Sequence, residues 1–155
     1  MTVTTFQGEE ADLLKEFSSL LSKHSSWHLC GHNAKKFDFP YISKRMLVHH
    51  IPLPPQLSTQ GMKPWEVPHH DTMEMWKFGS WYSSSLELLC AVFGIPSPKG
   101  DIDGSQVGTV FYQGEIDRIV RYCENDVVAL IQLYLAMRNE TLVEDAFINK
   151  VPNKS

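Results

Sequence analysis

The spacing of apolar and polar residues along the chain predicts a series of amphipathic helices. Apolar side chains recur at intervals of three and four residues, which is typical of helices that bury one face. The segments with this spacing are 8–23, 39–50, 84–93, 106–112 and 115–138. Pro40 is tolerated because it lies in a first helical turn, and Gly94 is expected to end the segment before it.

Shorter segments with strand character lie between these helices. They are 2–6, 26–30, which ends at Gly31, and 69–73. Strands that alternate with helices predict an α/β fold. Trp65, in the proline-rich loop 51–68, is expected to pack over the core, with a binding loop as the alternative. We expect one domain over residues 1–148 and a flexible tail over 149–155.

Length and composition narrow the class of protein. A chain of 155 residues fits one nuclease-sized domain and is too short for a whole polymerase. With 43% apolar and 21% charged residues, it is typical of a soluble globular protein. No apolar run reaches the roughly 18 to 20 residues of a membrane span, and the first ten residues lack the features of a signal peptide. We expect a cytoplasmic protein with no membrane partner.

The net charge of −4 argues against a large basic surface that coats nucleic acid nonspecifically. It does not exclude a metal-dependent nuclease, because bound cations offset its carboxylates. Cys30, Cys90 and Cys123 are odd in number and lie in apolar stretches, so buried, reduced thiols are expected. The histidine pairs 49–50 and 69–70 lack partners at zinc-finger spacing, which indicates surface or core residues.

The segment 31–45 is the first candidate for a functional site. It begins where a predicted strand ends, and ligands gather at the carboxyl ends of strands in open α/β sheets. Within it, Asp38 lies near the start of a predicted helix, where backbone N–H groups favour an anion. The alternative is that Asp38 simply caps this helix.

Tyr122 and Asp126 form the second candidate, on the longest predicted helix. Their spacing places the phenol and the carboxylate one above the other on the same face. Because Cys123 and Val127 flank Asp126 on the apolar stripe, the carboxylate is expected at the edge of the core, where it needs a partner or a metal. The alternative is an exposed acid at the margin of the stripe.

Together these segments resemble a known pair of motifs. Residues 33–41 (Asn-x-x-x-Phe-Asp-x-Pro-Tyr) resemble the second exonuclease motif in the proofreading domain of family B DNA polymerases, and residues 122–126 (Tyr-Cys-x-x-Asp) resemble the third. The order and separation match, and the similarity extends through 69–79 and 94–104. The chain thus resembles stand-alone predicted PolB-like 3′-5′ exonucleases of the DnaQ-like, RNase H-like superfamily.

The resemblance implies an RNase H-like α/β fold with a mixed central sheet and a metal-dependent 3′-5′ exonuclease. It implies two Mg²⁺ or Mn²⁺ ions held by four carboxylates, with a tyrosine that positions the attacking water. Asp38 and Asp126 would be metal ligands, and Tyr122 would hydrogen-bond the water. These three are the predicted catalytic residues.

The resemblance also implies where nucleic acid binds. Asn33 and Phe37 would lie beside the 3′-terminal nucleotide, where an aromatic ring can stack on a base. Lys35 and Lys36, with the basic pair 44–45, offer positive charge for phosphates; the alternative is an ordinary solvated helix face. The expected partner is single-stranded DNA or a DNA 3′ end, and RNA stays open as a substrate.

One departure from the family pattern changes the expected activity. The first motif, Asp-x-Glu on the first strand, is absent from the 155 residues, and Glu9, Glu10 and Asp12 open a predicted helix instead. Segment 2–6 resembles the third strand of such domains. We therefore expect the first two strands to be missing, through either truncation or degeneration, and an enzyme that is weakened or inactive. A sheet edge exposed in this way predicts a homodimer.

A noncatalytic module that binds nucleic-acid ends or a partner protein is the alternative function. Three further acids are candidate ligands. Asp71 is expected to make a structural hydrogen bond, and Asp101 and Asp103 are expected to bond the backbone of their own turn.

Overall fold

The computed structural model describes residues 1–97 and 100–152, and it divides the chain into two compact units. Phe6–Ser80 forms one, which we call the inserted unit. Met1–Thr5 and the described residues from Trp81 onward form the other, which we call the flanking unit. Each unit has its own hydrophobic core.

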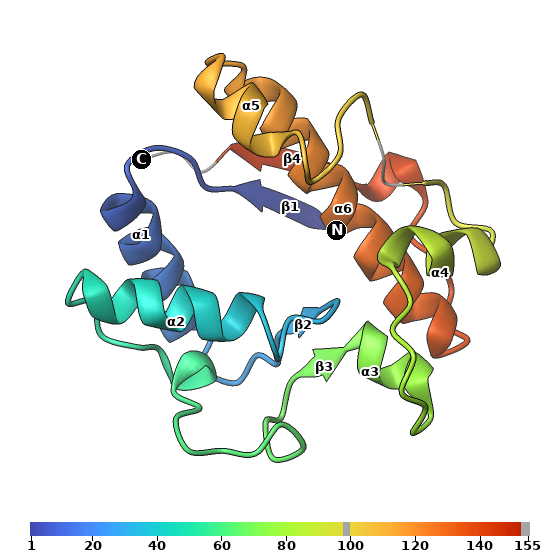
Figure 1. Ribbon diagram of the computed structural model, residues 1–155, viewed down its shortest axis with the longest axis horizontal. Helices are drawn as coiled ribbons and strands as arrows, with labels where there is room; N and C mark the ends of the chain where they lie inside the picture. Colours follow the sequence, from blue (N-terminus) through green and yellow to red (C-terminus); the bar gives the residue numbers. More distant parts are fainter. Residues whose placement is uncertain (98–99, 153–155) are drawn as a thin grey trace. The chain divides into compact units, whose positions relative to one another are not determined.

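Two helices dominate the inserted unit. α1 (Glu10–Lys23) and α2 (Asp38–Val48) pack against each other and against the short 3₁₀ helix η1 (Pro55–Leu57) (Figure 1). Both helices confirm the predicted ones, with ends shifted by up to two residues. Their apolar faces enclose a buried cluster of Leu14, Leu21, Met46, Ile51 and Leu57.

An acidic side chain joins these two helices. Glu10 accepts hydrogen bonds from Arg45 Nε at 2.7 Å and Nη2 at 2.5 Å, and lies 2.7 Å from His49 Nε2. The hydrogen bonds from Arg45 and His49 lower the pKa of Glu10 to about 2. Glu10 is therefore not only a partner of the α1 dipole, as expected from sequence, but also a cross-link between α1 and α2.

The strands of the inserted unit are shorter than predicted. β2 (Cys30–Gly31) pairs in parallel with β3 (His70–Asp71), and α3 (Thr72–Lys77) follows at once. The predicted strand 69–73 is thus wrong beyond Asp71. The physical reason is a helix cap, because the Asp71 side chain accepts hydrogen bonds from the first turn of α3.

Trp65 and His69, in and just after the proline-rich loop, can each be compared with its expected position. Trp65 is 76% exposed, and Lys63 Nζ lies 5.3 Å from its ring, so the prediction that it covers the core is wrong. Trp65 is neither a member of the buried cluster nor among the partly buried side chains packed against it. His69 is a core histidine, since its Nδ1 accepts the Leu29 N–H at 3.2 Å and its Nε2 lies 2.6 Å from a backbone carbonyl.

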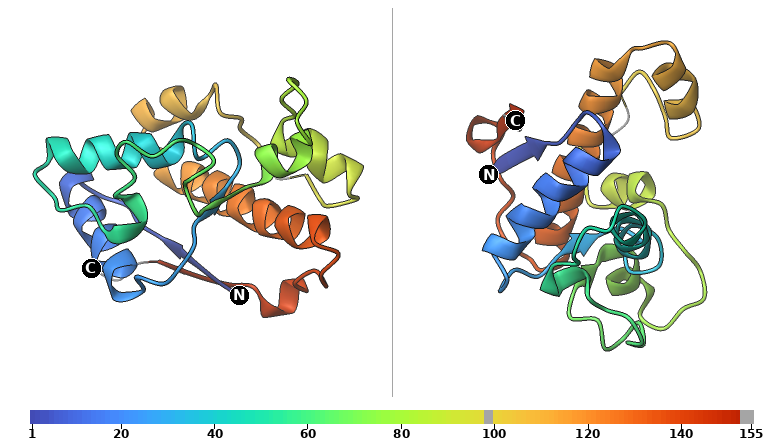
Figure 2. Two further views of the ribbon diagram at one scale, coloured as in Figure 1. Left: turned by 90° about the horizontal axis from the view of Figure 1, so that it is seen from below. Right: turned by 90° about the vertical axis from the view of Figure 1, so that its left-hand side faces the viewer.

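The flanking unit is closed by residues from the two ends of the described chain. β1 (Thr2–Thr5) pairs in parallel with β4 (Asn149–Pro152), and the two strands run side by side in Figures 1 and 2. The Asn149 N–H also donates to the Met1 carbonyl at 2.8 Å. The predicted flexible tail is therefore wrong for 149–152, because backbone pairing with a distant strand orders it; 153–155 lie outside the described residues.

The remaining helices of the flanking unit pack on α6 (Ile116–Met137), which also lies against β1. They are α4 (Leu86–Val92) and α5 (Val107–Tyr112), with a 3₁₀ helix η2 (Asp145–Phe147) before β4. Gly94, at φ 68°, ends α4 as predicted. The buried cluster here comprises Leu89, Cys90, Ile95, Ala129 and Leu133.

The short parallel sheets bear on the expected fold class. Helices combined with small parallel sheets are compatible with an α/β fold; the RNase H-like topology with a mixed central sheet stays a prediction. All three cysteines are free, but only Cys90 is fully buried, and Cys123 is exposed on α6, which corrects the expectation of three buried thiols. Within 1–97 and 100–152, no helix has the length and apolarity to cross a bilayer.

Candidate functional site

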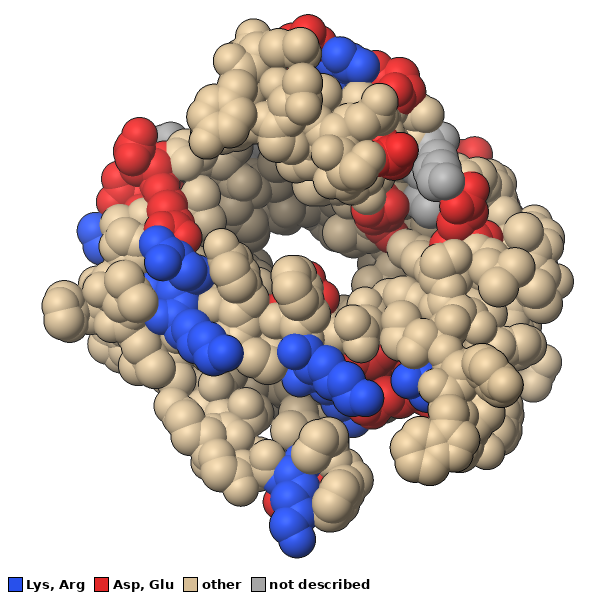
Figure 3. Space-filling view, in the orientation of Figure 1, with Lys and Arg blue, Asp and Glu red and all other residues tan. Residues whose placement is uncertain are grey.

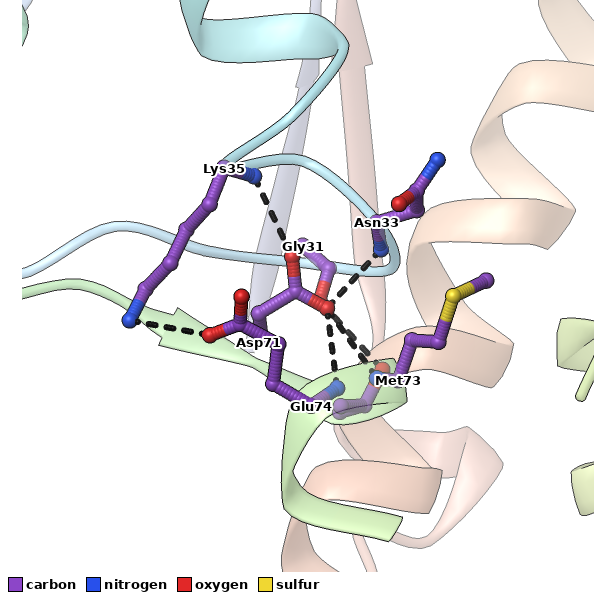
Figure 4. Close-up of polar contacts among 7 residues, drawn as sticks. Gly31, Asn33, Lys35, Asp71, Met73 and Glu74 are labelled. Carbon is purple, nitrogen blue, oxygen red and sulfur yellow. Dashed lines mark hydrogen bonds and ion pairs between the residues drawn. The ribbon is translucent and has the colours of Figure 1, made fainter. Parts of the chain in front are cut away.

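The loop between β2 and α2, which carries several predicted site residues, is held by the buried Asp71 carboxylate (Figure 4). Asp71 is 2% exposed. Its Oδ1 accepts backbone N–H bonds from Asn33 at 2.9 Å, Met73 at 3.1 Å and Glu74 at 3.4 Å, and its Oδ2 accepts one from Lys35 at 3.1 Å. One side chain therefore caps α3 and fixes the loop before α2. Asp71 confirms the expected structural hydrogen bond.

The start of this loop is packed closely around a glycine. A Cβ placed on Gly31 would overlap the Cβ of Ala34, which is itself buried. The Gly31 carbonyl accepts a hydrogen bond from Thr72 Oγ1 at 3.3 Å, and Thr72 Oγ1 lies 2.9 Å from His32 Nδ1. Asn33 has φ 63°, a left-handed conformation that asparagine tolerates better than most residues. The conformation of this loop thus depends on the residue types at Gly31, Asn33 and Ala34.

Asp38 is the first residue of α2, as its predicted position at a helix start requires. The N-cap is Phe37, which makes no side-chain capping hydrogen bond, and Asp38 follows it at the first helical position, so the ligand role and the capping role of Asp38 both stay predictions. Burial raises the pKa of Asp38, and the charge of Asp71 raises it further, while a hydrogen bond from its own backbone N–H lowers it. Judged by its solvent-accessible surface, Asp38 as a whole is nevertheless exposed, so a ligand can reach it from solvent.

The cationic residues of this segment differ in their surroundings. Lys35 Nζ lies 3.3 Å from the Glu74 carboxylate, and its side chain is only 10% exposed. Lys36, in contrast, is exposed. Arg45 is engaged by Glu10, as described above. Lys36 is therefore better placed than Lys35 to meet a phosphate from solvent.

The second predicted pair lies on α6 in the flanking unit. Tyr122 and Asp126 are both half-buried, and the Tyr122 hydroxyl donates a hydrogen bond to the Asp126 carboxylate. Burial raises the pKa of Asp126, although this hydrogen bond opposes the rise. Burial, the Asp126 charge and the hydrogen bond raise the pKa of Tyr122 to about 12. The structure thus confirms that both groups share a helix face.

The Tyr122–Asp126 hydrogen bond can be tested without any substrate. Asp126→Asn removes the negative charge beside the phenol, so the pKa of Tyr122 should fall from about 12 toward the ordinary value near 10. A titration of tyrosinate absorbance would measure it, with a Tyr122→Phe protein to assign the signal. Asp117→Asn, an exposed acid on the same helix, is the control and should leave the titration unchanged. The same curve for Asp126→Asn and the parent would contradict the contact.

A structural role that sequence analysis missed belongs to Glu124, between the two site residues. Its Oε1 accepts a hydrogen bond from Thr5 Oγ1 at 2.7 Å, and its Oε2 lies 3.4 Å from Lys150 Nζ. Glu124 thereby ties α6 to both β1 and β4. In the sequence, the only sign of this separate role was that Glu124 falls on a different face of the helix from Tyr122 and Asp126.

The described part of the chain contains no cluster of side chains that could hold a metal ion. In neither unit do the described His, Cys, Asp and Glu residues come together in a group of three. Asp38 belongs to the inserted unit and Asp126 to the flanking unit. Asp101 lies 2.7 Å from Arg118 and also accepts a hydrogen bond from its own backbone N–H, and Asp103 accepts the Ser105 N–H at 2.8 Å, which confirms the expected backbone bonds of both residues.

The comparison with protein families gives one match. Residues 1–152 match the family of predicted 3′-5′ exonucleases related to the exonuclease domain of PolB. Because the match covers almost the whole chain, the protein belongs to this family, which confirms the resemblance seen in the motifs. No curated protein and no solved structure matches the chain significantly.

Proposed function

We propose that the chain is a 3′-5′ exonuclease-type domain that binds the 3′ end of a DNA strand and hydrolyses its phosphodiester bonds weakly or not at all. The observation that carries this proposal is the hydrogen-bonded Tyr122–Asp126 pair on α6, in a chain that belongs to the exonuclease family. Asp38 at the start of α2 is the third proposed site residue. Asn33, Phe37, Lys35 and Lys36 are the proposed nucleic-acid contacts.

The proposed role of Tyr122 follows from its place beside Asp126 on α6. A phenol with a pKa of about 12 stays protonated at neutral pH, so its O–H remains a hydrogen-bond donor. Asp126 accepts that hydrogen bond, which leaves the lone pairs of the phenol oxygen as acceptors. The phenol oxygen can then accept a hydrogen bond from a water and orient it, which is a positioning role in hydrolysis.

The carboxylates limit the expected rate. Mg²⁺ and Mn²⁺, the proposed metals, each bind through several oxygen ligands. A site for two such ions therefore requires more than two carboxylates. Asp38 and Asp126 remain the proposed ligands, but the 155 residues contain no Asp-x-Glu pair to complete the set. This shortage favours a second candidate, a noncatalytic module that binds nucleic-acid ends.

A single assay separates the two candidates. A 5′-labelled single-stranded DNA is incubated with Mg²⁺ or Mn²⁺ and the parent, Asp126→Ala or Tyr122→Phe protein. For an exonuclease, a slow 3′-shortening ladder should be abolished by Asp126→Ala and slowed about a hundredfold by Tyr122→Phe, as expected for a lost positioning group. Asp117→Ala, an exposed acid on α6, should cleave like the parent.

Each outcome of this assay has a definite meaning. Binding of the strand without cleavage by the parent supports the noncatalytic module. Cleavage that persists unchanged in Asp126→Ala contradicts the proposed site. A labelled RNA strand of the same sequence, run in parallel, decides whether the 2′-hydroxyl is accepted.

A further inference from the structure

The exposed face of α2 carries two aromatic rings beside each other. Phe37 is 63% exposed and Tyr41 is 56% exposed, one helical turn apart. Their ring centroids lie 6.2 Å apart, and the ring planes differ by only 7°. Neither ring belongs to the buried cluster of the inserted unit. The two side chains thus present nearly parallel rings to solvent at the start of the helix.

Cations accompany these rings. Lys36 directly precedes Phe37, and Lys44 lies one turn beyond Tyr41; both are exposed. Lys and Arg side chains are visible over α2 in Figure 3. Glu10, the acid of α1 that reaches α2, is already engaged by Arg45 and His49 and so does not neutralise Lys44. On a chain of net charge −4, this face combines aromatic surface with local positive charge.

We infer that Phe37, Tyr41 and Lys44 form a track along α2 that binds consecutive nucleotides of a single nucleic-acid strand. The inference rests on the proposed function, because it extends the contact expected of Phe37 with the terminal nucleotide. The two rings stack on two bases, and Lys44 pairs with a phosphate. Aromatic rings next to cations are the combination with which proteins hold single strands without reading their sequence.

The spacing of the rings selects a single strand over a duplex. Bases stacked in duplex DNA follow one another at about 3.4 Å along each strand. Rings 6.2 Å apart are too widely spaced to cover two bases that remain stacked on each other. Two neighbouring bases can therefore each take a ring only after they have separated, which a duplex resists and a single strand allows.

Charge decides between nucleic acid and an apolar protein partner. A protein that covered the two rings with apolar surface would also have to desolvate Lys36 and Lys44, which is costly without acidic partners. A nucleic-acid strand supplies a phosphate for each base, so aromatic and cationic groups are satisfied together. The two rings, with a lysine on either side of them in the sequence, therefore fit a nucleic-acid strand better than an apolar protein surface.

The test measures binding in EDTA, so that cleavage plays no part. Fluorescence anisotropy of a labelled oligo(dT) strand gives Kd for the parent and three variants. Tyr41→Ala should weaken binding about tenfold, as expected for the loss of one base–ring stack. Tyr41→Phe keeps the ring and should bind within twofold of the parent, and Lys44→Gln should reduce the salt dependence of Kd.

Trp65→Ala is the matched control, because Trp65 is also an exposed ring with a lysine beside it but belongs to the proline-rich loop and not to α2. It should bind like the parent. If the parent binds but Tyr41→Ala binds equally well, the track is wrong and the proposed function stands. If the parent binds no single strand, the nucleic-acid contact in the proposed function fails, and the track fails with it. Equal affinity of the parent for a blunt duplex would also overturn the track.

Discussion

Asp71→Ala is expected to lower the free energy of unfolding of the inserted unit by about 3 to 4 kcal/mol, since several half-buried N–H groups lose a buried, charged acceptor at once. Two of the four N–H groups belong to the loop before α2, at Asn33 and Lys35, and two belong to the first turn of α3. Urea unfolding followed by circular dichroism would measure the loss. Hydrogen exchange should also accelerate at the Asn33 and Lys35 amides.

Two variants make this result specific. Asp71→Asn keeps one carbonyl oxygen for Asn33 and the α3 cap but turns an NH₂ group toward the Lys35 N–H, so an intermediate loss is expected. Asp12→Ala removes an exposed acid of the same unit, paired only with exposed Lys15, and should change stability by less than about 0.5 kcal/mol. An Asp71→Ala protein as stable as Asp12→Ala would show that the buried carboxylate does not hold the loop.

Gly31→Ala is expected to have the second large effect, for a steric reason. The new Cβ would overlap the Cβ of Ala34, and the Ala34 Cα also lies close, at 3.5 Å. Because Ala34 is buried and Gly31 is held in β2, neither residue can move away easily. Overpacking of this kind costs about 2 to 3 kcal/mol. Thermal unfolding of the variant would measure it.

A second-site change tests the cause. Ala34→Gly removes the Cβ that the new side chain would meet, so the double variant Gly31→Ala/Ala34→Gly should be more stable than Gly31→Ala alone. Gly108→Ala serves as the control, since no atom lies within 4 Å of its added Cβ and it occupies a helix. That change should leave stability unaltered or raise it. No recovery in the double variant would rule out the overlap as the cause.

The helices could be predicted from sequence because their signals are local. α6 was expected over 115–138 and is found over Ile116–Met137, since a long apolar stripe specifies both the helix and its buried face. The contact between Tyr122 and Asp126 followed from the same periodicity, because four residues along a helix bring side chains together. Family membership followed from two short motifs in register.

What could not be predicted depends on contacts between distant residues. Residues 149–152 have no strand pattern of their own and become β4 only by pairing with β1. The start of α3, in contrast, had a local signal that was overlooked. Asp71 and Glu74 have the spacing of a capping box, although Glu74 pairs with Lys35 in the structure. That Asp71 also binds the loop before α2 depends on the fold and has no local signal.

The pairing of β1 with β4 also has a consequence for the order of folding during synthesis. All of Phe6–Ser80 lies in one continuous stretch, so the inserted unit can fold while later residues are still being made. β1 is synthesised long before Asn149–Pro152, the strand with which it pairs, so this sheet can form only when those residues have been made. β1, which precedes every other described element in the sequence, is therefore among the last of them to reach its final structure, because its pairing with β4 closes a long loop whose entropy cost slows the step.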